Sequence, residues 1–271
     1  MTNSKKYLQF WNKYGQTALV AGGSDGLGAA YSEALARRGL NLIMIAREKT
    51  RLEAAAARIR EKYAVDVKTI AADLADYENV KSIITDLLSA ENKYSIGLLV
   101  YNAAFAPIGL FENTSEDHLA LAAAVNVRTP LLLAKLLSKP MIQNERGGIV
   151  LMSSLAGAQG SPKLAAYAAT KAFNAVLAEG LWKELKPRGV DVIACCAGAI
   201  LTPGYSQAEK SKKAPGTMTA NEVAEQTLKA LGKKPVIVPG AVNKIGRFVL
   251  TRLLSRKAAI EIMLKNTGGL S

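Results

Sequence analysis

Tyr167 and Lys171 form a pair of residues that could carry out proton transfer. The sequence around them has a helical composition, and side chains four residues apart lie on the same face of a helix, so both can point into one site. A nearby ammonium group favours the phenolate and lowers the pKa of a tyrosine from its ordinary value of about 10. Such a tyrosine can exchange a proton with an alcohol or a carbonyl near neutral pH. Pairs with this spacing also occur by chance on many helices, so the pair alone does not identify a site.

Two further polar residues are candidates for the same site. Ser154 follows a short apolar strand and stands thirteen residues before Tyr167, and doubly wound sheets place ligand contacts at the carboxyl ends of strands. Its alternative role is to form a turn, and its neighbour Ser153 is the competing serine, although the spacing to Tyr167 favours Ser154. Asn126 lies within an apolar helical pattern, where a buried amide needs hydrogen-bond partners. It either supports a neighbouring segment of backbone or serves the site.

A glycine-rich turn joins the first predicted strand to the first predicted helix. Its glycines allow the backbone to approach a pyrophosphate, and the following helix offers its N-terminal N–H groups to the same anion. The alternative is that the glycines only permit tight packing of strand and helix, but the strand before the turn and the amphipathic helix after it favour a dinucleotide site. The predicted cofactor contacts in this turn are Gly22, Ser24, Asp25, Gly26, Leu27 and Gly28.

Arg47 follows the second predicted strand, where a dinucleotide-binding fold recognises the adenosine ribose. An acidic residue at this position would accept a hydrogen bond from the 2′-hydroxyl of NAD, whereas an arginine accommodates the 2′-phosphate of NADP. The alternative is a solvated surface charge. The sequence therefore predicts a preference for NADP, with NAD as the second possibility.

These residues require a framework that brings them together. Short apolar segments alternate with longer helical patterns, which is typical of strands buried on both faces of a parallel sheet. The predicted strands are Thr17–Ala21, Leu40–Ile45, Asp66–Ala71, Ile96–Tyr101, Ile149–Met152, Val190–Cys196 and Val236–Val238. The predicted helices include Leu27–Arg38, Thr50–Lys62, Glu78–Glu91, Leu119–Leu137 and a helix that runs to Leu231 from a capping box at Thr219 and Glu222. This alternation predicts an α/β fold with right-handed crossovers.

The length and composition limit the class of protein. The chain has 271 residues, of which 49% are hydrophobic, so it has enough apolar side chains for a core and is not expected to be disordered. We expect one domain over residues 1–240 and a tail over 241–271. No apolar run approaches the roughly 20 residues that span a bilayer, and the first residues contain no secretory signal.

The cysteine and histidine content excludes further chemistry. Cys195 and Cys196 are adjacent, so they can neither close a loop by a disulfide nor form a zinc site, and we expect them to be inert core residues. We expect no bound metal. We expect the protein to be in a reducing, cytoplasmic setting. The single histidine, His118, excludes a mechanism that needs two and is expected at the surface near a helix start.

In their order and spacing, the glycine turn, Asn126, Ser154, Tyr167 and Lys171 resemble the short-chain dehydrogenase/reductase family over roughly residues 15–240. The resemblance implies a Rossmann-type doubly wound parallel sheet of seven strands in the order 3-2-1-4-5-6-7, and a nicotinamide cofactor. It also implies that Tyr167 is the general acid/base and that Lys171 binds the nicotinamide ribose and tunes Tyr167. Ser154 would orient the substrate oxygen, and Asn126 would hold a water of a proton relay.

The resemblance implies further cofactor contacts outside the glycine turn. They are Asp73 and Leu74 at the adenine, Asn102 in a segment similar to the family's N-N-A-G motif, and Ile200 and Thr202 in a segment similar to its P-G-x-x-x-T motif. The chain departs from these motifs at Tyr101, Ala104 and Ala197. It also has Asp25 where members that prefer NADP often have a lysine or arginine, which opposes the prediction from Arg47.

A closer likeness is to the branch with 3-ketoacyl-CoA reductases and 17β-hydroxysteroid dehydrogenases, seen around residues 23–36 and 45–52. This likeness implies a large apolar substrate. We therefore expect an NADP-dependent oxidoreductase that transfers a hydride between the nicotinamide and the carbonyl or alcohol of a hydrophobic, lipid-like substrate. The alternative is a non-catalytic protein of the same fold that holds a dinucleotide or a lipid at a membrane surface, but such a protein has no chemical reason to keep the Tyr–Lys pair.

The end of the chain has two unusual segments. Residues 203–218 are polar and contain proline and glycine, so we expect a long loop that acts as a lid over the site. Residues 233–271 contain eight basic residues and one acidic residue, with apolar residues such as Ile245 and Phe248 at near-helical spacing. We expect this tail to wall the pocket or to lie at the interface of a homodimer or homotetramer. The alternative is a basic amphipathic helix on an anionic membrane, while nucleic-acid binding is not expected because no binding module accompanies the charge.

Overall fold

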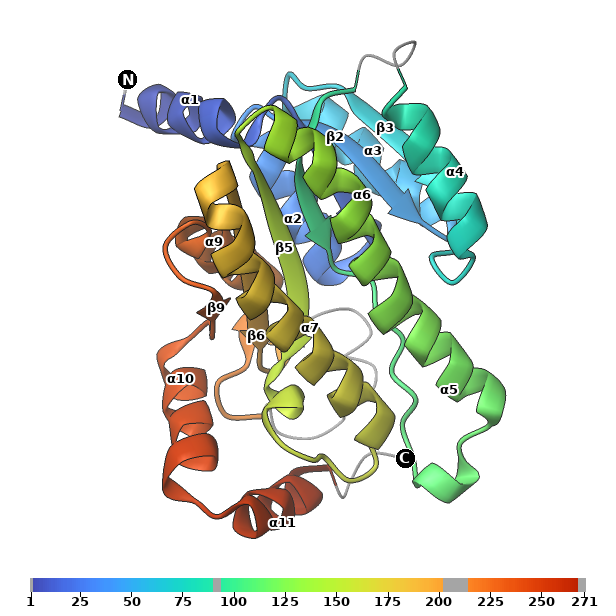
Figure 1. Cartoon of the computed structure of the whole chain (residues 1–271), viewed down its shortest axis with the longest axis vertical. Coiled ribbons are helices and arrows are strands. Elements are labelled where there is room, and N and C mark those ends of the chain that lie inside the picture. Colours follow the sequence, from blue (N-terminus) through green and yellow to red (C-terminus); the bar gives the residue numbers. More distant parts are fainter. Residues whose placement is uncertain (1, 90–93, 202–213, 268–271) are drawn as a thin grey trace.

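The computed structural model describes residues 2–89, 94–201 and 214–267 and is built around a parallel sheet of seven strands (Figure 1). The strand order is β3-β2-β1-β4-β5-β6-β9, and every neighbouring pair is parallel. The strands are β1 (Thr17–Ala21), β2 (Asn41–Ala46), β3 (Val67–Ala71), β4 (Ile96–Tyr101), β5 (Gly147–Ser154), β6 (Val190–Ala197) and β9 (Val236–Ile237). The predicted strands and the predicted order are therefore confirmed.

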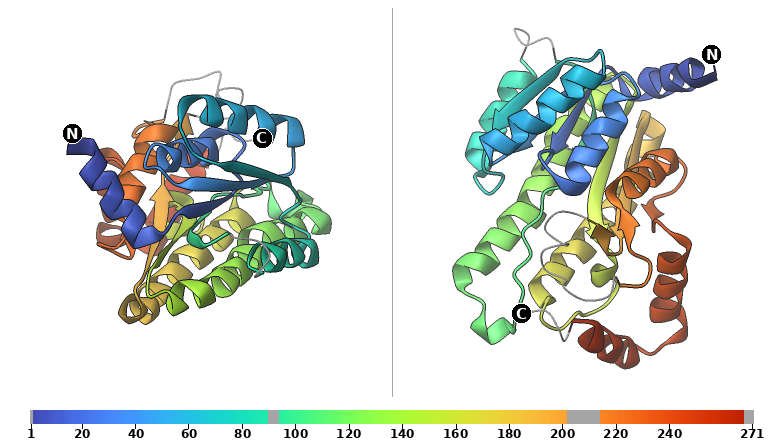
Figure 2. Two further views of the ribbon diagram at one scale, coloured as in Figure 1. Left: turned by 90° about the horizontal axis from the view of Figure 1, so that it is seen from above. Right: turned by 180° about the vertical axis from the view of Figure 1, so that it is seen from behind.

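Helices cover both faces of this sheet (Figure 2). On one face, the apolar sides of α2 (Gly26–Ala36), α3 (Lys49–Lys62) and α9 (Ala220–Ala230) pack in a single buried cluster. On the other face, α4 (Tyr77–Leu87), α6 (Thr129–Gln143) and α7 (Ala165–Leu185) form a second cluster. Because successive strand residues point to opposite faces, Leu19 lies in the second cluster and its neighbour Val20 in the first. This two-sided burial explains why the strands have continuous apolar sequences.

The helix that precedes the fifth strand is longer than its predicted range. Residues of α5 (Glu116–Ala123), a π-helical turn (Ala124–Arg128) and α6 follow one another without a break. Glu116–Gln143 is long and apolar enough to cross a membrane. Its inner side, however, packs on the sheet through Leu133, Leu137 and Met141, which is the position of a core helix in a doubly wound fold.

Short elements close the carboxyl edge of the sheet and the end of the chain. A two-stranded sheet pairs β7 (Ile200–Leu201) with β8 (Met218–Thr219), immediately before α9 and its predicted capping box. The tail continues as α10 (Ala241–Phe248), a π-helical turn (Val249–Leu253) and α11 (Arg256–Thr267). The predicted lid over residues 203–218 lies mostly outside the described residues.

Helix α1 (Thr2–Tyr14) was not predicted from the sequence and lies at the opposite end of the molecule from α10 and α11 (Figure 1). It is anchored by Tyr14, whose hydroxyl donates a hydrogen bond of 2.8 Å to the buried carboxylate of Asp191 at the start of β6. Lys186 forms an ion pair of 2.6 Å with the same carboxylate, and Lys13 forms another. Asp191 therefore joins the first helix to the sixth strand.

We expect Asp191→Asn to reduce the free energy of unfolding at neutral pH by about 1–3 kcal/mol, since charge-assisted hydrogen bonds are lost. Burial alone would raise the pKa of Asp191, but the hydrogen bonds from Lys13, Lys186 and Tyr14 outweigh burial and lower it below the ordinary value of 3.8. A carboxylate with a lowered pKa stabilises the fold above its unfolded pKa, and this contribution is lost as the pH falls through the folded value. Denaturant unfolding should thus show a difference in the free energy of unfolding between the wild type and Asp191→Asn at pH 7, and this difference should become smaller below about pH 4. A difference of constant size would contradict this account.

Candidate active site

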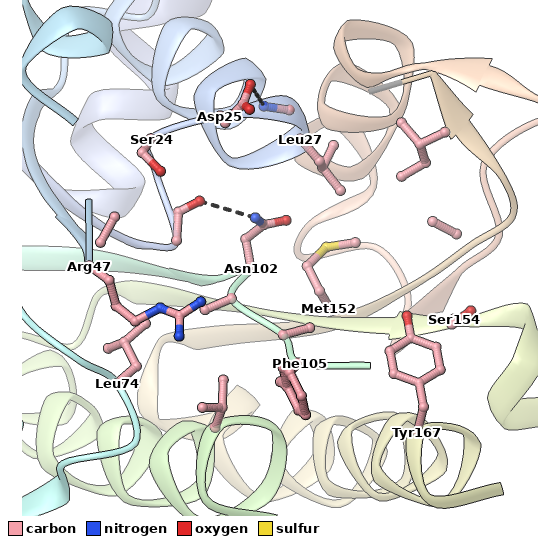
Figure 3. A pocket seen from close by; sticks show the side chains of 18 of the residues that line it. Ser24, Asp25, Leu27, Arg47, Leu74, Asn102, Phe105, Met152, Ser154 and Tyr167 are labelled. Atoms are coloured by element: carbon pink, nitrogen blue, oxygen red, sulfur yellow. Dashed lines mark hydrogen bonds between the residues drawn. The ribbon is translucent and has the colours of Figure 1, made fainter. Parts of the chain in front are cut away.

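A cavity of about 610 Å³ opens at the carboxyl ends of the strands (Figure 3). This is the edge at which open α/β sheets bind ligands. Most of the residues predicted to form the site line this cavity: Gly22, Ser24, Asp25, Gly26, Leu27, Arg47, Asp73, Leu74, Asn102, Ser154, Tyr167, Lys171 and Ile200. Gly28 and Asn126 lie behind its walls, and Thr202 lies outside the described residues.

The glycine turn needs glycine for steric reasons that the structure makes visible. Gly22 has a φ of 82°, and a Cβ there would lie 2.7 Å from the backbone nitrogen of Ala103. A Cβ on Gly28 would lie only 1.8 Å from the carbonyl oxygen of Gly22, so the start of α2 packs directly against the turn. The side chain of Asn102 donates a hydrogen bond of 3.2 Å to the same carbonyl. These contacts leave the turn's backbone open toward the cavity.

Asp25 has a structural role that explains the departure from the family pattern. It is the N-cap of α2, and its Oδ1 accepts a hydrogen bond of 2.6 Å from the backbone N–H of Gly26. An acidic residue at this position also interacts favourably with the helix dipole. Because the carboxylate is directed at its own helix, its presence does not require an NAD-specific ribose contact.

The far end of the cavity carries two arginines. Arg47 follows β2 and extends into the cavity (Figure 3), as predicted, and Arg51 lies one turn further along in α3 and lines the same cavity. Sequence reasoning missed Arg51, because Arg47 lies before the N-cap of α3 and a helical spacing therefore does not relate the two residues. Asp73 and Leu74 lie at this end too, and the Leu74 carbonyl is held by the Thr129 hydroxyl at 2.7 Å.

Tyr167 and Ser154 meet at the other end of the cavity, where their hydroxyl groups lie close to each other (Figure 3). Lys171 is buried beneath them, with its Nζ 5.5 Å from the centre of the Tyr167 ring and 3.0 Å from the carbonyl oxygen of Met152, to which it donates a hydrogen bond. The competing Ser153 instead donates its hydroxyl to the backbone carbonyl of Lys171 at 2.7 Å. Ser153 therefore joins α7 to β5, and although both serines line the cavity, Ser154 is the one that interacts with the Tyr167 hydroxyl.

The expected lowering of the tyrosine pKa by Lys171 is not found, and this prediction is corrected. Burial raises the pKa of Tyr167 above its ordinary value of 10.0, and a hydrogen bond with Ser154 opposes this effect only in part. Burial also lowers the pKa of Lys171 to about 8, so the amine is still mostly protonated at pH 7, but its ammonium group is directed at the Met152 carbonyl. In this state Tyr167 keeps its proton at neutral pH, as a proton donor must.

The comparisons with known proteins agree with this geometry. Residues 16–213 match the model of the short chain dehydrogenase family. The chain belongs to this family. The protein is 31% identical to a very-long-chain 3-oxoacyl-CoA reductase of Phaeosphaeria nodorum, over 96% of this chain and 78% of the relative. It is also 34% identical to the human inactive hydroxysteroid dehydrogenase-like protein 1, over 66% of this chain and 54% of the relative.

Solved structures of short-chain dehydrogenases share the fold. A structure from work on 7beta-hydroxysteroid dehydrogenase stereoselectivity has a TM-score of 0.86 and 25% identity, with 94% of this chain and 98% of that chain covered. A short-chain dehydrogenase from Sphingobium yanoikuyae in complex with NADPH has a TM-score of 0.73 and 32% identity, with 82% and 86% covered. As a member of this family, the protein is an oxidoreductase that acts on hydroxyl or carbonyl groups.

Within this dehydrogenase, Asn126 supports backbone next to the site. It is fully buried in the π-helical turn, where its Oδ1 accepts from the N–H of Phe105 at 2.8 Å and its Nδ2 donates to the carbonyl of Phe105 at 2.7 Å. Its own carbonyl accepts a hydrogen bond of 2.8 Å from Asn174. The structure thus shows that Asn126 supports the backbone beside the site. The relay water that Asn126 would hold stays a prediction.

The apolar wall beside Tyr167 was not predicted. It is formed by Phe105, Leu121, Val125 and Met152, which come from three different elements and the segment after β4. The described part of the tail, residues 241–267, contributes no residue to the cavity's lining, so the predicted role as a wall of the pocket is not found. The large apolar side chains of α10, which are Val242, Ile245 and Phe248, are instead exposed. The tail's predicted position at an interface or at the pocket mouth stays a prediction.

The remaining sequence predictions concern residues outside the cavity. His118 is exposed in the first turn of α5, which Ser115 caps, and its ring packs on Phe105 with centroids 5.3 Å apart. Cys195 and Cys196 are buried free thiols, and burial raises the pKa of Cys195 to about 12. A thiol with such a pKa is unreactive, as expected.

Proposed function

We propose that this dehydrogenase uses NADP(H) to interconvert a carbonyl and an alcohol on a large apolar substrate. The observation that carries the proposal is the juxtaposition of the Tyr167 and Ser154 hydroxyls over the buried Lys171, at one end of a cavity whose other end holds Arg47 and Arg51. One end thus offers proton transfer, and the other offers positive charge.

The residues present fit a dinucleotide. The Gly22–Gly28 turn has no room for a Cβ at either glycine, and the N-terminus of α2 follows it, which together form a cradle for a pyrophosphate. Asp73, Leu74 and Asn102 would line the adenosine side, and Lys171 and Ile200 the nicotinamide side. When bound, the nicotinamide supplies or accepts the hydride.

Residues of the chain itself donate the proton to the substrate oxygen or accept it. In the direction of reduction, the Tyr167 hydroxyl donates its proton to the carbonyl oxygen as negative charge develops there. Ser154 holds that oxygen in line by a second hydrogen bond, and Lys171 stabilises the phenolate that remains. The raised pKa of Tyr167 keeps the hydroxyl protonated before the reaction. In the direction of oxidation, the same residues act in reverse.

Two features support a large apolar substrate. The wall beside Tyr167 is built from apolar side chains, among them Phe105 and Leu121, and burial of apolar surface stabilises an apolar ligand. Relatives and neighbours of this chain include a very-long-chain 3-oxoacyl-CoA reductase and a protein from work on a hydroxysteroid dehydrogenase. We therefore propose long-chain 3-oxoacyl thioesters and steroid ketones as the first substrates to test.

The test is a panel of ketones with NADPH or NADH, followed by loss of nicotinamide absorbance. We expect turnover with NADPH and with the bulky apolar ketones, and little with short polar ones. Binding of NADPH, detected by its fluorescence, without turnover on any member would instead favour the non-catalytic alternative, to which the inactive human relative draws attention. The predicted homodimer or homotetramer and the cytoplasmic setting are separate proposals, tested by light scattering and by fractionation.

We expect Arg47→Asp to weaken NADPH binding roughly ten- to a hundredfold, because a charge-assisted hydrogen bond contributes about 1.5–3 kcal/mol, and to spare or improve NADH binding. Arg51→Ala should weaken NADPH less and leave NADH unchanged. Arg58→Asp, on the same helix but outside the cavity, is the matched control. Fluorescence titration of both cofactors measures these effects. A wild-type protein that binds NADH more tightly than NADPH would contradict the assignment.

A further inference from the structure

Helix α10 of the tail presents its apolar side chains to solvent and a polar side to the protein. Asn243 of α10 is buried, and its side chain donates to the carbonyls of Gly216 at 2.9 Å and Pro239 at 3.0 Å. On the opposite side of the helix, Ile245 is 64% exposed and Phe248 57% exposed. Surface helices normally bury their apolar face. This inverted orientation indicates that the outer face of α10 binds something apolar.

The exposed face continues beyond α10. Val242 precedes Ile245 by three residues, which places both on the same side of the helix, and Leu253 ends the π-helical turn that prolongs α10. These two residues are 56% and 65% exposed. We call Val242, Ile245, Phe248 and Leu253 the outer face of the tail.

Positive charge accompanies this face. Between residues 241 and 267, the six basic residues exceed the single acid, Glu261, by five charges. They are Lys244, Arg247, Arg252, Arg256, Lys257 and Lys265, and none forms an ion pair with another residue that the structure describes. Lys244 and Arg252 are exposed beside the outer face, whereas Arg247 shares the inner side with Asn243 and Arg256 donates to the carbonyl of Ala158 at 3.2 Å. An apolar face with exposed cations beside it is the pattern of a helix that lies in the interface of an anionic bilayer.

Helix α10 lies close to the active-site cavity. Asn243 packs closely on Gly198, because a Cβ on that glycine would lie 2.7 Å from its Oδ1, and Gly198 lines the active-site cavity. Only the thickness of α10, roughly 10 Å, therefore separates the outer face from the cavity wall. In Figure 1 both α10 and α11 lie at the end of the molecule where β5 and β6 end, far from α1.

From these observations we propose that the outer face of the tail docks on an anionic lipid surface beside the mouth of the active site. A second copy of the chain is the competing occupant, but a symmetric contact through this face would bring two groups of unpaired cations together, and like charges repel. A bilayer with acidic headgroups matches both the apolar residues and the charge. The proposal concerns binding alone and does not depend on the identity of the substrate.

Co-sedimentation of the full chain with vesicles tests the proposal. We expect binding to vesicles of phosphatidylcholine that contain phosphatidylserine, much weaker binding to pure phosphatidylcholine, and a decline as salt is raised. Ile245→Ser with Phe248→Ser should lower binding at least about tenfold, because two apolar side chains lose their burial. Leu8→Ser with Val176→Ser, which changes two exposed apolar residues on other helices, is the matched control and should bind like the wild type.

Charge is tested in the same way. Lys244→Glu with Arg252→Glu should lower binding to the anionic vesicles by more than about tenfold, since each basic residue near such a surface contributes about fivefold. Lys135→Glu with Lys139→Glu, at exposed positions of α6, changes the net charge by the same amount as the tail variant. It should lower vesicle binding much less. Thermal unfolding confirms that every variant is folded.

Three outcomes would overturn the proposal. The first is a wild-type protein that does not bind anionic vesicles. The second is equal binding by the Ile245/Phe248 variant and its control. The third is a wild-type dimer that becomes a monomer in the Ile245/Phe248 variant while neither protein binds vesicles, which would assign the outer face to self-association.

Discussion

Tyr167→Phe is expected to lower turnover at least a hundredfold, because loss of a general acid typically costs about 10²–10⁴ in rate. The substitution removes one hydroxyl from the cavity and keeps the aromatic ring, so the cavity keeps its shape. NADPH affinity should change little, because the phenol is not placed among the cofactor's main anchors. Steady-state turnover together with a fluorescence titration separates the two quantities.

Tyr101→Phe provides the matched control. Its hydroxyl is also buried, but it donates to the carbonyl of Val125 at 2.5 Å and does not line the cavity. This variant should lose some stability and retain turnover within a few-fold. Near-normal turnover in Tyr167→Phe, or an equal loss in both variants, would be inconsistent with Tyr167 as the proton donor.

Gly28→Ala is expected to reduce NADPH affinity by about a hundredfold or more. The new Cβ would lie 1.8 Å from the Gly22 carbonyl oxygen, so the turn and the start of α2 must move apart, and such overpacking costs up to about 3 kcal/mol. A displaced turn no longer offers its backbone N–H groups to the pyrophosphate. Calorimetric titration with NADPH measures the loss, and thermal unfolding shows whether the fold survives.

Gly180→Ala tests whether the effect belongs to the turn. Gly180 lies within α7, and a Cβ there would meet nothing within 4 Å. Alanine is favoured over glycine inside a helix by roughly 1 kcal/mol, so this variant should be as stable as the wild type or more so. A Gly28→Ala protein that binds NADPH like Gly180→Ala would refute the steric argument.

The framework and most of the site could be predicted because local sequence determines them. Each strand is a short apolar run between helical patterns, so its position can be recognised without knowledge of its neighbours. Gly22 and Ser154 then lie at one edge because the carboxyl ends of parallel strands share it, and Tyr167 reaches this edge from α7, the helix that follows β5. The helix α9 was predictable for a similar reason, since Thr219 and Glu222 form a capping box in the structure.

Properties that depend on three-dimensional surroundings could not be predicted. The raised pKa of Tyr167 comes from burial, and the spacing of Tyr167 and Lys171 in the sequence does not show how deeply the two side chains are buried. The role of Asn126 follows from a π-helical turn that aims its amide at Phe105. The orientation of α10 was unpredictable too, because an amphipathic pattern does not state which side faces the protein.

The contact between Tyr14 and Asp191 joins positions 177 residues apart, which has a consequence for synthesis on the ribosome. At translation rates of about 5–20 residues per second, Tyr14 emerges roughly 10–35 s before its partner. During that time Tyr14 and Lys13 lack the carboxylate to which they bind, although Arg38, which lies over the Phe10 ring, is already synthesised. The N-terminal helix is thus one of the last parts of this fold to be secured, and a nascent chain that stalls before β6 should leave it open to proteases.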